Sequence, residues 1–346
     1  MKIAIIKPSA LGDICHALPV LTALRERYPQ AHLSWVVNRS FEPLLSGHPH
    51  LNATIPFDRG LLKRGLTSAL TGSLALLKRL RRERFDLVVD LQGLLRTGLM
   101  TAATRAPRRI GFANAREGAR HFYTERIDVP DADSIHAVDR YWRIAEYLDA
   151  GQRPKRFIVP IPPDEQAAVS QDLGSFPRPW SAVAVGAKWV TKRWRPSHFA
   201  DLLTRVQSHF GGTVLFVGIA DDAADSESIR TVLPGPAVNL CGRTSLPRLA
   251  AVLSLSDVAI MNDTGPLHLA AALGIPCVAP YTCTKTIRHG PYTSPGGGIE
   301  TRVACAGSYL KQCPNHMICM NDLTAESLWP RLREVMQTWS QRSRSA

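Results

Sequence analysis

Short apolar runs alternate with longer helical stretches along this chain, and the pattern occurs twice. In the first half the apolar runs are Ile3–Ile6, Leu33–Val37 and Leu87–Leu91, and Leu61–Arg84 is an intervening helical stretch. In the second half the apolar runs are Ala182–Val185, Thr213–Val217, Ala237–Leu240, Val258–Met261 and Pro276–Pro280. Such alternation is typical of parallel sheets wound with helices. The sequence therefore predicts an α/β fold with two Rossmann-like domains.

A proline-rich passage separates the two halves. Its prolines flank one short helical segment and are Pro154, Pro160, Pro162, Pro163, Pro177 and Pro179. Because such a segment interrupts regular structure, we interpret part of it as an interdomain linker. The predicted parts are a first domain at 1–160, a linker at 161–180, a second domain at 181–325, and a C-terminal helix and tail at 326–346. Each domain is long enough to form its own core.

A turn with the residues of an anion-binding site follows the apolar run Val258–Met261. It reads Asn262-Asp263-Thr264-Gly265-Pro266-Leu267-His268 and leads into a short helical stretch. A helix N-terminus binds phosphate because its unpaired backbone N–H groups and its dipole both point at the ligand. The alternative is that Asp263 and Thr264 only cap the helix.

A second loop of this kind follows the first apolar run of the chain. It reads Ser9-Ala10-Leu11-Gly12-Asp13 and precedes a helical stretch that extends to Tyr28. Gly12 allows close approach of a ligand to the backbone, and Asp13 lies at the carboxyl edge of the predicted sheet. Ligands of open α/β sheets bind at this edge. Each half of the chain therefore places an acidic residue where a ligand is expected.

With these motifs the chain resembles glycosyltransferase family 9, the ADP-heptose:lipopolysaccharide heptosyltransferases. The matching motifs are Ser9-Ala10-Leu11-Gly12-Asp13, Asp90-Leu91-Gln92-Gly93, Lys192-Arg193-Trp194 and the turn Asn262–His268. Trp35-Val36-Val37 and Asp90–Leu94 look more like the heptosyltransferase I branch. The resemblance extends from Met1 to about residue 335. It implies a GT-B fold, in which two Rossmann-like domains face each other across a cleft.

The resemblance also implies a reaction. It is the inverting transfer of a heptose from an ADP-heptose donor to the Kdo region of the lipopolysaccharide inner core, on a lipid-linked acceptor. GT-B enzymes usually stabilise the departing diphosphate without a divalent cation, and no cofactor is implied. Asp13 matches the residue that the family is proposed to use as a base. A carboxylate can accept the proton of the acceptor hydroxyl when it lies within hydrogen-bond reach of that hydroxyl. The alternative role of Asp13 is to cap the helix that follows it.

The loop after the first apolar run of the second half matches the family's leaving-group site. Lys192 can meet the negative charge that develops on the diphosphate, an interaction that is stronger in the transition state than before it. Lys188 and Thr191, in the same loop, are expected to add phosphate contacts. The family usually continues Trp-Pro, whereas this chain has Trp194-Arg195-Pro196. Because of that insertion, no role is assigned to Arg193.

The remaining predicted donor contacts lie in two turns. Asp263, Thr264, Gly265 and His268 are expected near the diphosphate, although a histidine at such a place is otherwise most often a packing residue. The family commonly places an acidic residue at the ribose hydroxyls, which here is Asp221 or Asp222, and we take Asp222 as the candidate.

The charge of the chain points to an anionic partner. The net charge is +13, and the interval from Arg59 to Arg126 has 15 Lys and Arg against 5 Asp and Glu. Because no nucleic-acid motif accompanies this charge, we expect no nucleic acid and favour an acidic lipid surface. The stretch from Leu61 to Arg82 combines leucines with a basic flank. It is predicted either to lie on an anionic membrane or to present an ordinary solvated helix face.

Targeting signals and cysteines indicate the compartment. No apolar run is long enough to span a bilayer, and Lys7 and Asp13 interrupt what would be the core of a signal peptide. Seven cysteines and no signal favour reduced thiols, so we expect a cytoplasmic protein, peripheral on the inner membrane. Cys305, Cys313 and Cys319 cluster, with His316 or Cys283 as a further ligand if they hold a metal. Their spacing matches no standard zinc pattern, so free thiols are favoured and no metal site is predicted.

Two other functions remain open at this point. One is a transferase of the same fold that uses another nucleotide sugar and acts on a different glycan or on a protein. The other is a catalytically silent protein that binds sugar nucleotides, against which Asp13 and Lys192 argue.

Overall fold

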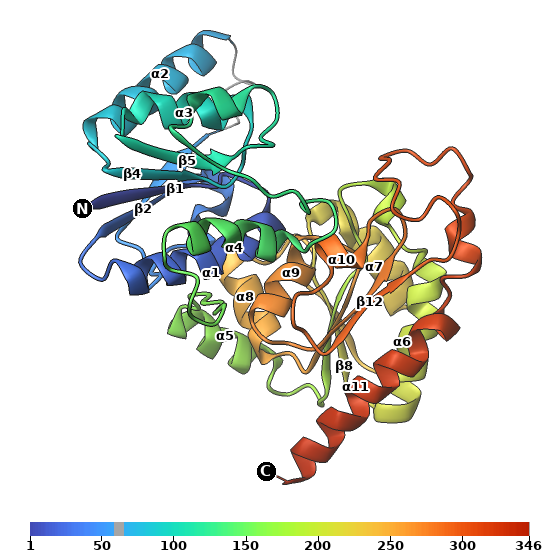
Figure 1. The fold of residues 1–346 in the computed structure, drawn as a ribbon. Helices are drawn as coiled ribbons and strands as arrows, with labels where there is room; N and C mark the ends of the chain where they lie inside the picture. The colour runs from blue at the N-terminus through green and yellow to red at the C-terminus, as the bar shows by residue number, and fades with distance from the viewer. Residues whose placement is uncertain (59–65, 346) are drawn as a thin grey trace. The chain divides into compact units, whose positions relative to one another are not determined.

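The computed structural model describes residues 1–58 and 66–345, which form two compact units, Met1–Pro160 and Ile161–Ala346. Each unit has a parallel sheet flanked by helices (Figure 1). In the described residues the first sheet has six strands in the order β3-β2-β1-β4-β5-β6, and the second has six in the order β12-β11-β10-β7-β8-β9. Both are Rossmann-like, as the alternation of apolar and helical stretches predicts.

The first unit alternates strands and helices along most of its length. Its strands are β1 (Lys2–Ile6), β2 (His32–Asn38), β3 (Ala53–Phe57), β4 (Leu87–Asp90), β5 (Arg108–Phe112) and β6 (Glu125–Ile127). Its α-helices are α1 (Leu11–Arg27), α2 (Leu66–Arg82), α3 (Leu95–Thr104) and α4 (Ala137–Tyr147). The helix expected over Leu61–Arg84 is seen as α2, and the expectation for residues 61–65 lies outside the described residues.

The second unit repeats this plan. Its strands are β7 (Trp180–Ala184), β8 (Thr213–Phe216), β9 (Ala237–Asn239), β10 (Val258–Met261), β11 (Cys277–Tyr281) and β12 (Gly296–Glu300). Its α-helices are α5 (Pro163–Leu173), α6 (Pro196–Phe210), α7 (Ala223–Arg230), α8 (Leu246–Leu255), α9 (Gly265–Ala272), α10 (Thr286–His289) and α11 (Ala325–Ser345). The segment 161–180 contains α5, which packs against α8, and α11 packs against α6, β11 and β12 of the same unit.

The strand order places a switch point in each sheet. From β1 the chain adds β2 and β3 on one side and then returns to pair β4 with β1 on the other side. From β7 it adds β8 and β9 and then returns to pair β10 with β7. At such a point the loops that leave the two central strands diverge, and the crevice between them binds ligands.

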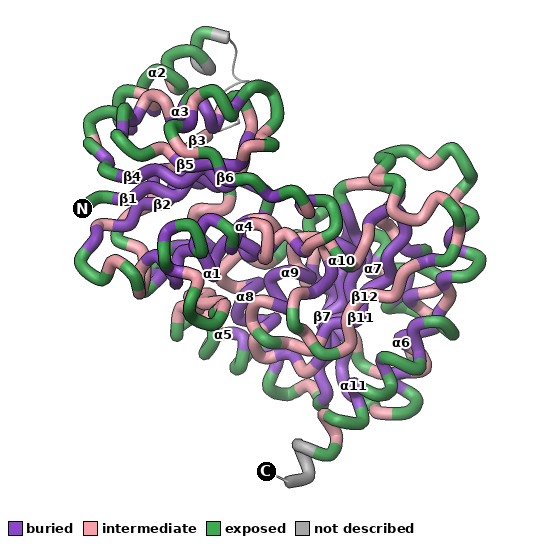
Figure 2. Tube along the Cα trace, viewed as in Figure 1, coloured by how far each residue is buried: buried purple, intermediate pink, exposed green. Residues whose placement is uncertain are grey.

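Both sheets are covered by helices, and their central strands are buried along their length (Figure 2). In the first unit, side chains of α2 and α3 such as Leu76, Leu80 and Met100 pack on apolar strand residues. In the second, Phe199 of α6 and Leu328 of α11 belong to one large cluster with Trp194. These cores fix the strand ends from which the site loops emerge. Among the described residues, no helix is both long and apolar enough to cross a membrane.

Candidate functional site

The switch point of the second unit brings together the loop after β7 and the turn after β10. Asn262 joins them, because its Oδ1 accepts a hydrogen bond from the Trp194 backbone N–H (3.1 Å) and its Nδ2 donates to the Val185 carbonyl (2.6 Å). The Trp194 indole is buried and donates to the Leu323 carbonyl at 2.5 Å. The buried tryptophan and asparagine therefore fix the loop that carries Lys192.

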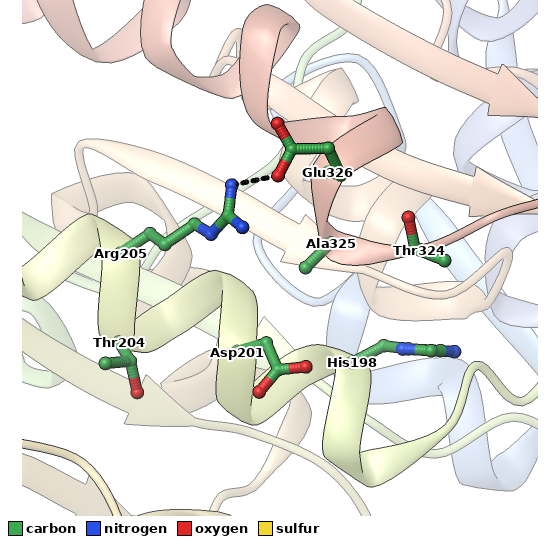
Figure 3. A pocket seen from close by; sticks show the side chains of 7 residues that line it. All are labelled: His198, Asp201, Thr204, Arg205, Thr324, Ala325 and Glu326. Atoms are coloured by element: carbon green, nitrogen blue, oxygen red, sulfur yellow. Dashed lines mark ion pairs between the residues drawn. The ribbon is translucent and has the colours of Figure 1, made fainter.

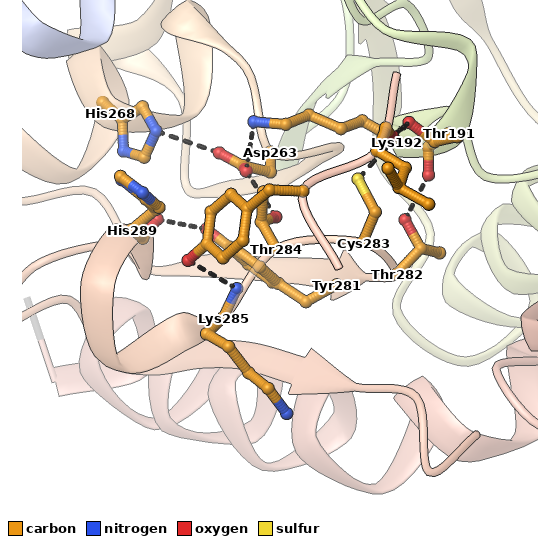
Figure 4. A network of polar contacts seen from close by, with 12 residues as sticks. Thr191, Lys192, Asp263, His268, Tyr281, Thr282, Cys283, Thr284, Lys285 and His289 are labelled. Atoms are coloured by element: carbon orange, nitrogen blue, oxygen red, sulfur yellow. Dashed lines mark hydrogen bonds and ion pairs between the residues drawn. The ribbon is translucent and has the colours of Figure 1, made fainter. Parts of the chain in front are cut away.

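Lys192 forms an ion pair with Asp263 at this point. The Lys192 ammonium lies 2.6 Å from Oδ2 of Asp263 and 4.9 Å from the centre of the Trp189 ring. The same carboxylate oxygen accepts a hydrogen bond from the Thr284 hydroxyl at 2.7 Å, and Oδ1 lies 3.2 Å from Nε2 of His268 (Figure 4). The structure thus brings together Lys192, Asp263 and His268, three residues that the sequence predicts to lie near the phosphates of the donor.

The charge balance of this cluster favours an anionic Asp263. Burial alone would raise the pKa of Asp263, but the hydrogen bond from His268 and the charge of Lys192 hold that pKa well below its usual range. Both carboxylate oxygens are occupied by protein groups. Asp263 consequently orients Lys192 and His268, while the side chain of Lys192, about one-fifth exposed, remains accessible to an incoming anion. Whether Asp263 itself contacts substrate remains a prediction.

The end of β11 supplies residues that the sequence reasoning missed. Thr284 follows this strand, and Tyr281 donates from its hydroxyl to the His289 carbonyl at 2.5 Å. Burial lowers the pKa of His289 to about 4, so its ring is neutral at pH 7. The sequence did contain a signal for Thr284. The expected strand Pro276–Pro280 ends shortly before this residue, and ligand-binding groups gather after the ends of such strands.

The other residues that were predicted to contact the donor differ in their exposure and in their hydrogen bonds. Lys188 is exposed beside the Lys192 loop, whereas Thr191 is buried and donates its hydroxyl to the Leu310 carbonyl at 2.7 Å. Thr264 and Gly265 form the start of α9, with Thr264 at the N-cap position. The start of α9 stays the predicted anion site, whereas the Thr191 hydroxyl holds the conformation of its own loop.

Asp222 is buried against two glycines. Its Oδ2 accepts a hydrogen bond from the Ile219 N–H at 3.0 Å, and a Cβ atom at Gly186 or Gly218 would overlap with its carboxylate. Burial raises the pKa of Asp222, and that hydrogen bond opposes the shift. Asp221 is the exposed carboxylate of this turn. The structure therefore offers Asp221 as the more accessible of the two candidates for the ribose.

The first unit carries Asp13 on the first turn of α1. Its Oδ2 accepts from the Ala10 N–H at 3.0 Å, and its Oδ1 accepts from the Tyr141 hydroxyl at 3.1 Å. The side chain is still 39% exposed. Asp13 therefore does cap its helix. The same contacts hold its carboxylate at the edge of the sheet, where it is partly accessible, so capping does not exclude catalysis. Gly12 is buried beside it in α1.

Lys7 links the Asp13 loop to the loop after β4. Its buried ammonium lies 3.6 Å from Oδ1 of Asp13, donates to the Leu91 carbonyl at 3.3 Å and lies 4.8 Å from the centre of the Tyr141 ring. Burial lowers the pKa of Lys7, and the charges of Asp13 and Asp90 oppose that shift. Lys7 and Tyr141 are positioning groups. A lysine at the strand end was visible in the sequence, but nothing indicated that α4 would bring Tyr141 to it.

The Asp90–Gly93 motif has a structural role. Oδ1 of the buried Asp90 accepts from the Gln92 and Gly93 N–H groups at 2.8 and 3.1 Å, and Oδ2 accepts from the Tyr123 hydroxyl at 2.8 Å. Gly93 has φ +67°, a conformation that glycine adopts without strain. The motif thus shapes the loop beside Asp13 at the switch point of the first sheet.

The clustered cysteines line a small cavity in the second unit. Cys283, Cys305, Cys313 and Cys319 surround a space of about 30 Å³, and all seven cysteines are free thiols. Among the described residues, no three His, Cys, Asp or Glu side chains are arranged to hold a metal ion.

A larger depression of about 430 Å³ lies between α6 and the start of α11. Figure 3 shows the Arg205–Glu326 ion pair within it. None of the predicted site residues lines this depression.

Comparison with known proteins gives the family. A family model described as glycosyltransferase family 9 (heptosyltransferase) matches residues 73–318, more than half of the chain. The chain belongs to glycosyltransferase family 9. This confirms the resemblance carried by the four motifs. The family 9 chain is thus a glycosyltransferase of the heptosyltransferase class, whose curated relatives act on lipopolysaccharide.

Individual relatives of this family 9 protein match along most of their length. The lipopolysaccharide core heptosyltransferase OpsX of Haemophilus influenzae is 27% identical over 296 residues, which are 85% of this chain and 82% of OpsX. Lipopolysaccharide heptosyltransferase 1 of Pseudomonas aeruginosa is 29% identical over 326 residues, 90% of this chain and 87% of that protein. Relatives named heptosyltransferase 1, 2 and 3 all match at 23–29% identity, so identity does not separate the branches.

The fold is also shared with a solved heptosyltransferase. The Escherichia coli heptosyltransferase WaaC with ADP-2-deoxy-2-fluoro heptose has a TM-score of 0.73 at 22% identity, covering 96% of this chain and 99% of that one. This similarity shows the GT-B fold class, and the predicted fold class is confirmed.

Proposed function

We propose that this family 9 protein is an inverting, metal-independent transferase that moves a heptose from ADP-heptose to the Kdo region of the lipopolysaccharide inner core. The observation that carries the proposal is the Lys192 ammonium, held 2.6 Å from Asp263 at the switch point of the second sheet. Ligands of such sheets bind at this place, and a fixed cation there suits a diphosphate. We further propose the heptosyltransferase I branch, on the sequence motifs Trp35–Val37 and Asp90–Leu94.

The proposed reaction is a single displacement. An acceptor hydroxyl attacks the anomeric carbon of the donor, its proton passes to the Asp13 carboxylate, and the bond from that carbon to the diphosphate oxygen breaks. The new glycosidic bond forms on the opposite face, which inverts the configuration. Lys192 stabilises the negative charge that grows on the departing ADP, while Tyr141 and Lys7 hold Asp13.

The donor assignment rests on the second unit. The solved WaaC holds an ADP-heptose analogue, and we carry that ligand to this chain as a proposal. The start of α9 and His268 are proposed to face the diphosphate, with Lys188 nearby. Asp221 or Asp222 is proposed to hold the ribose.

The acceptor and the compartment follow from the same proposal. A Kdo acceptor is lipid-linked, and the excess of basic residues between Arg59 and Arg126 matches the charge of an acidic lipid surface around it. We propose that the protein acts at the cytoplasmic face of the inner membrane.

A thermal-shift panel tests the donor assignment. We expect ADP and ADP-heptose to raise the melting temperature, whereas UDP and GDP have little effect. A ligand that binds only the folded state at 100 times its Kd adds about 2.7 kcal/mol to the free energy of unfolding. The Asp13→Asn variant should show the full ADP shift, and Lys192→Ala a reduced one. Equal shifts with UDP or GDP would point to a different nucleotide sugar and refute the ADP-heptose assignment.

A further inference from the structure

The first unit exposes leucines on two neighbouring helices. Leu70 and Leu74 of α2 are 63% and 55% exposed, and Leu95 and Leu99 of α3 are 44% and 46% exposed. Each pair is spaced four residues apart, which puts both members on one side of the helix. We call these four residues the leucine surface. Figure 2 shows that α2 in particular is largely exposed, although Leu76 and Leu80 anchor its other side in the core.

The leucine surface lies toward the edge of the sheet that carries Asp13. Helices α2 and α3 each connect parallel strands, β3 to β4 and β4 to β5, so both start at the carboxyl edge of the sheet. Leu95 is the first residue of α3, directly after the Asp90–Gly93 loop, and Leu70 lies within the first turns of α2. The loop that presents Asp13 leaves β1 at this same edge.

The two helices that carry the leucine surface contribute charges of one sign, although the exposed Glu117 accepts a hydrogen bond from the Leu95 backbone N–H at 3.2 Å. Neither α2 nor α3 contains an Asp or Glu residue. Four exposed cations, Lys78, Arg79, Arg81 and Arg82, lie in the last turns of α2. Lys78 and Arg81 continue the side of the helix that carries Leu70 and Leu74, because they follow at helical spacing. Exposed apolar side chains beside a group of four cations match an anionic lipid surface, because such a surface binds both kinds of side chain.

We propose that the leucine surface and the α2 cations dock this protein on an anionic bilayer. The leucines enter the headgroup–acyl boundary and the cations pair with lipid phosphates, so that Asp13 faces a head group that projects from the membrane. The purpose of this docking, which is access to a lipid-linked acceptor, rests on the proposed function. The docking itself is argued from the exposure and charge of α2 and α3.

Flotation of the full chain with vesicles tests the docking. The vesicles contain phosphatidylcholine alone or mixed with phosphatidylglycerol. We expect binding to the mixed vesicles that weakens with salt, because exposed charges are screened beyond about 10 Å at 0.1 M salt. Changing all four members of the leucine surface to Gln, or Lys78, Arg79, Arg81 and Arg82 to Gln, should each reduce binding about tenfold or more.

Matched variants in the second unit control for general effects. Val232→Gln with Ile318→Gln removes exposed apolar side chains elsewhere, and the joint change of Arg302, Lys311, Arg331 and Arg333 to Gln removes four positive charges elsewhere. Both controls should bind vesicles like the wild type. Circular dichroism should show unchanged melting for every variant, since the altered side chains are exposed.

Activity on two acceptor forms separates this inference from the proposed function. The leucine and cation variants should raise KM for acceptor embedded in vesicles and leave transfer to a deacylated acceptor unchanged. If the wild type transfers no heptose to either form, the proposed function fails, and flotation still decides the docking. Docking is refuted if the wild type does not float with anionic vesicles, if the leucine variant floats equally well, or if the surface instead binds a protein partner.

Discussion

Replacing Asp13 with Asn is expected to lower kcat by about 100-fold or more, because the side chain loses its ability to accept the acceptor proton. The amide keeps an oxygen that can accept from Tyr141 and nearly the same shape. The affinity for ADP should remain nearly unchanged, because the expected nucleotide site lies on the second unit. Steady-state kinetics and ADP titration of the purified variant measure both quantities.

Tyr141→Phe is the matched variant for this experiment. It removes one hydrogen bond to Asp13 but leaves the carboxylate as a base. Its kcat should fall by much less than that of Asp13→Asn, by roughly the 0.5–1.5 kcal/mol that one hydrogen bond contributes. Equal activity of Asp13→Asn and the wild type would rule out Asp13 as the base.

Replacing Lys192 with Ala should lower kcat and weaken donor binding together. The ammonium is placed to contact the phosphates both before and during the reaction, so part of its effect appears in the ground state. We expect a loss of about 2–4 kcal/mol in transition-state stabilisation, or about 30- to 1000-fold in kcat/KM. Donor titration and kinetics with saturating acceptor separate the two contributions.

A neighbouring lysine provides the control for Lys192. The exposed Lys311 also lies near the Trp189 ring, at 5.8 Å from its centre, so Lys311→Ala removes a similar charge from the same surroundings. Its kinetics should match the wild type.

EDTA should have little effect on the activity of the wild type. A large loss with EDTA that Mg²⁺ restores would contradict a mechanism in which Lys192 stabilises the leaving group.

The sequence predicted the parts of the site that depend on strand ends. Apolar runs such as Val258–Met261 locate a buried strand, and a parallel strand presents its next residues at the carboxyl edge of the sheet. The residue pattern therefore predicts that Asp263 and His268 lie at this edge, and the structure places both of them there, in contact with each other. The four motifs also identified the family, which the family model confirms.

The sequence could not predict contacts that arise from packing. Nothing in the residues around Tyr141 shows that α4 carries its hydroxyl to Asp13, more than a hundred positions earlier in the chain. The partners of Asp263 likewise come from three separate segments, so its role in orienting Lys192 appears only in the folded chain. Strand β12 begins with three glycines and has no alternating pattern, so it escaped prediction.

The measurement that tests the central claim most directly is product analysis with purified protein, ADP-heptose and a deacylated acceptor that ends in Kdo. Mass spectrometry should show an acceptor heavier by one heptose unit, and NMR should show that the anomeric configuration of the donor is inverted. The product should form in the presence of EDTA and be reduced strongly with Asp13→Asn and with Lys192→Ala. An unchanged acceptor, or transfer with retained configuration, would contradict the proposed reaction.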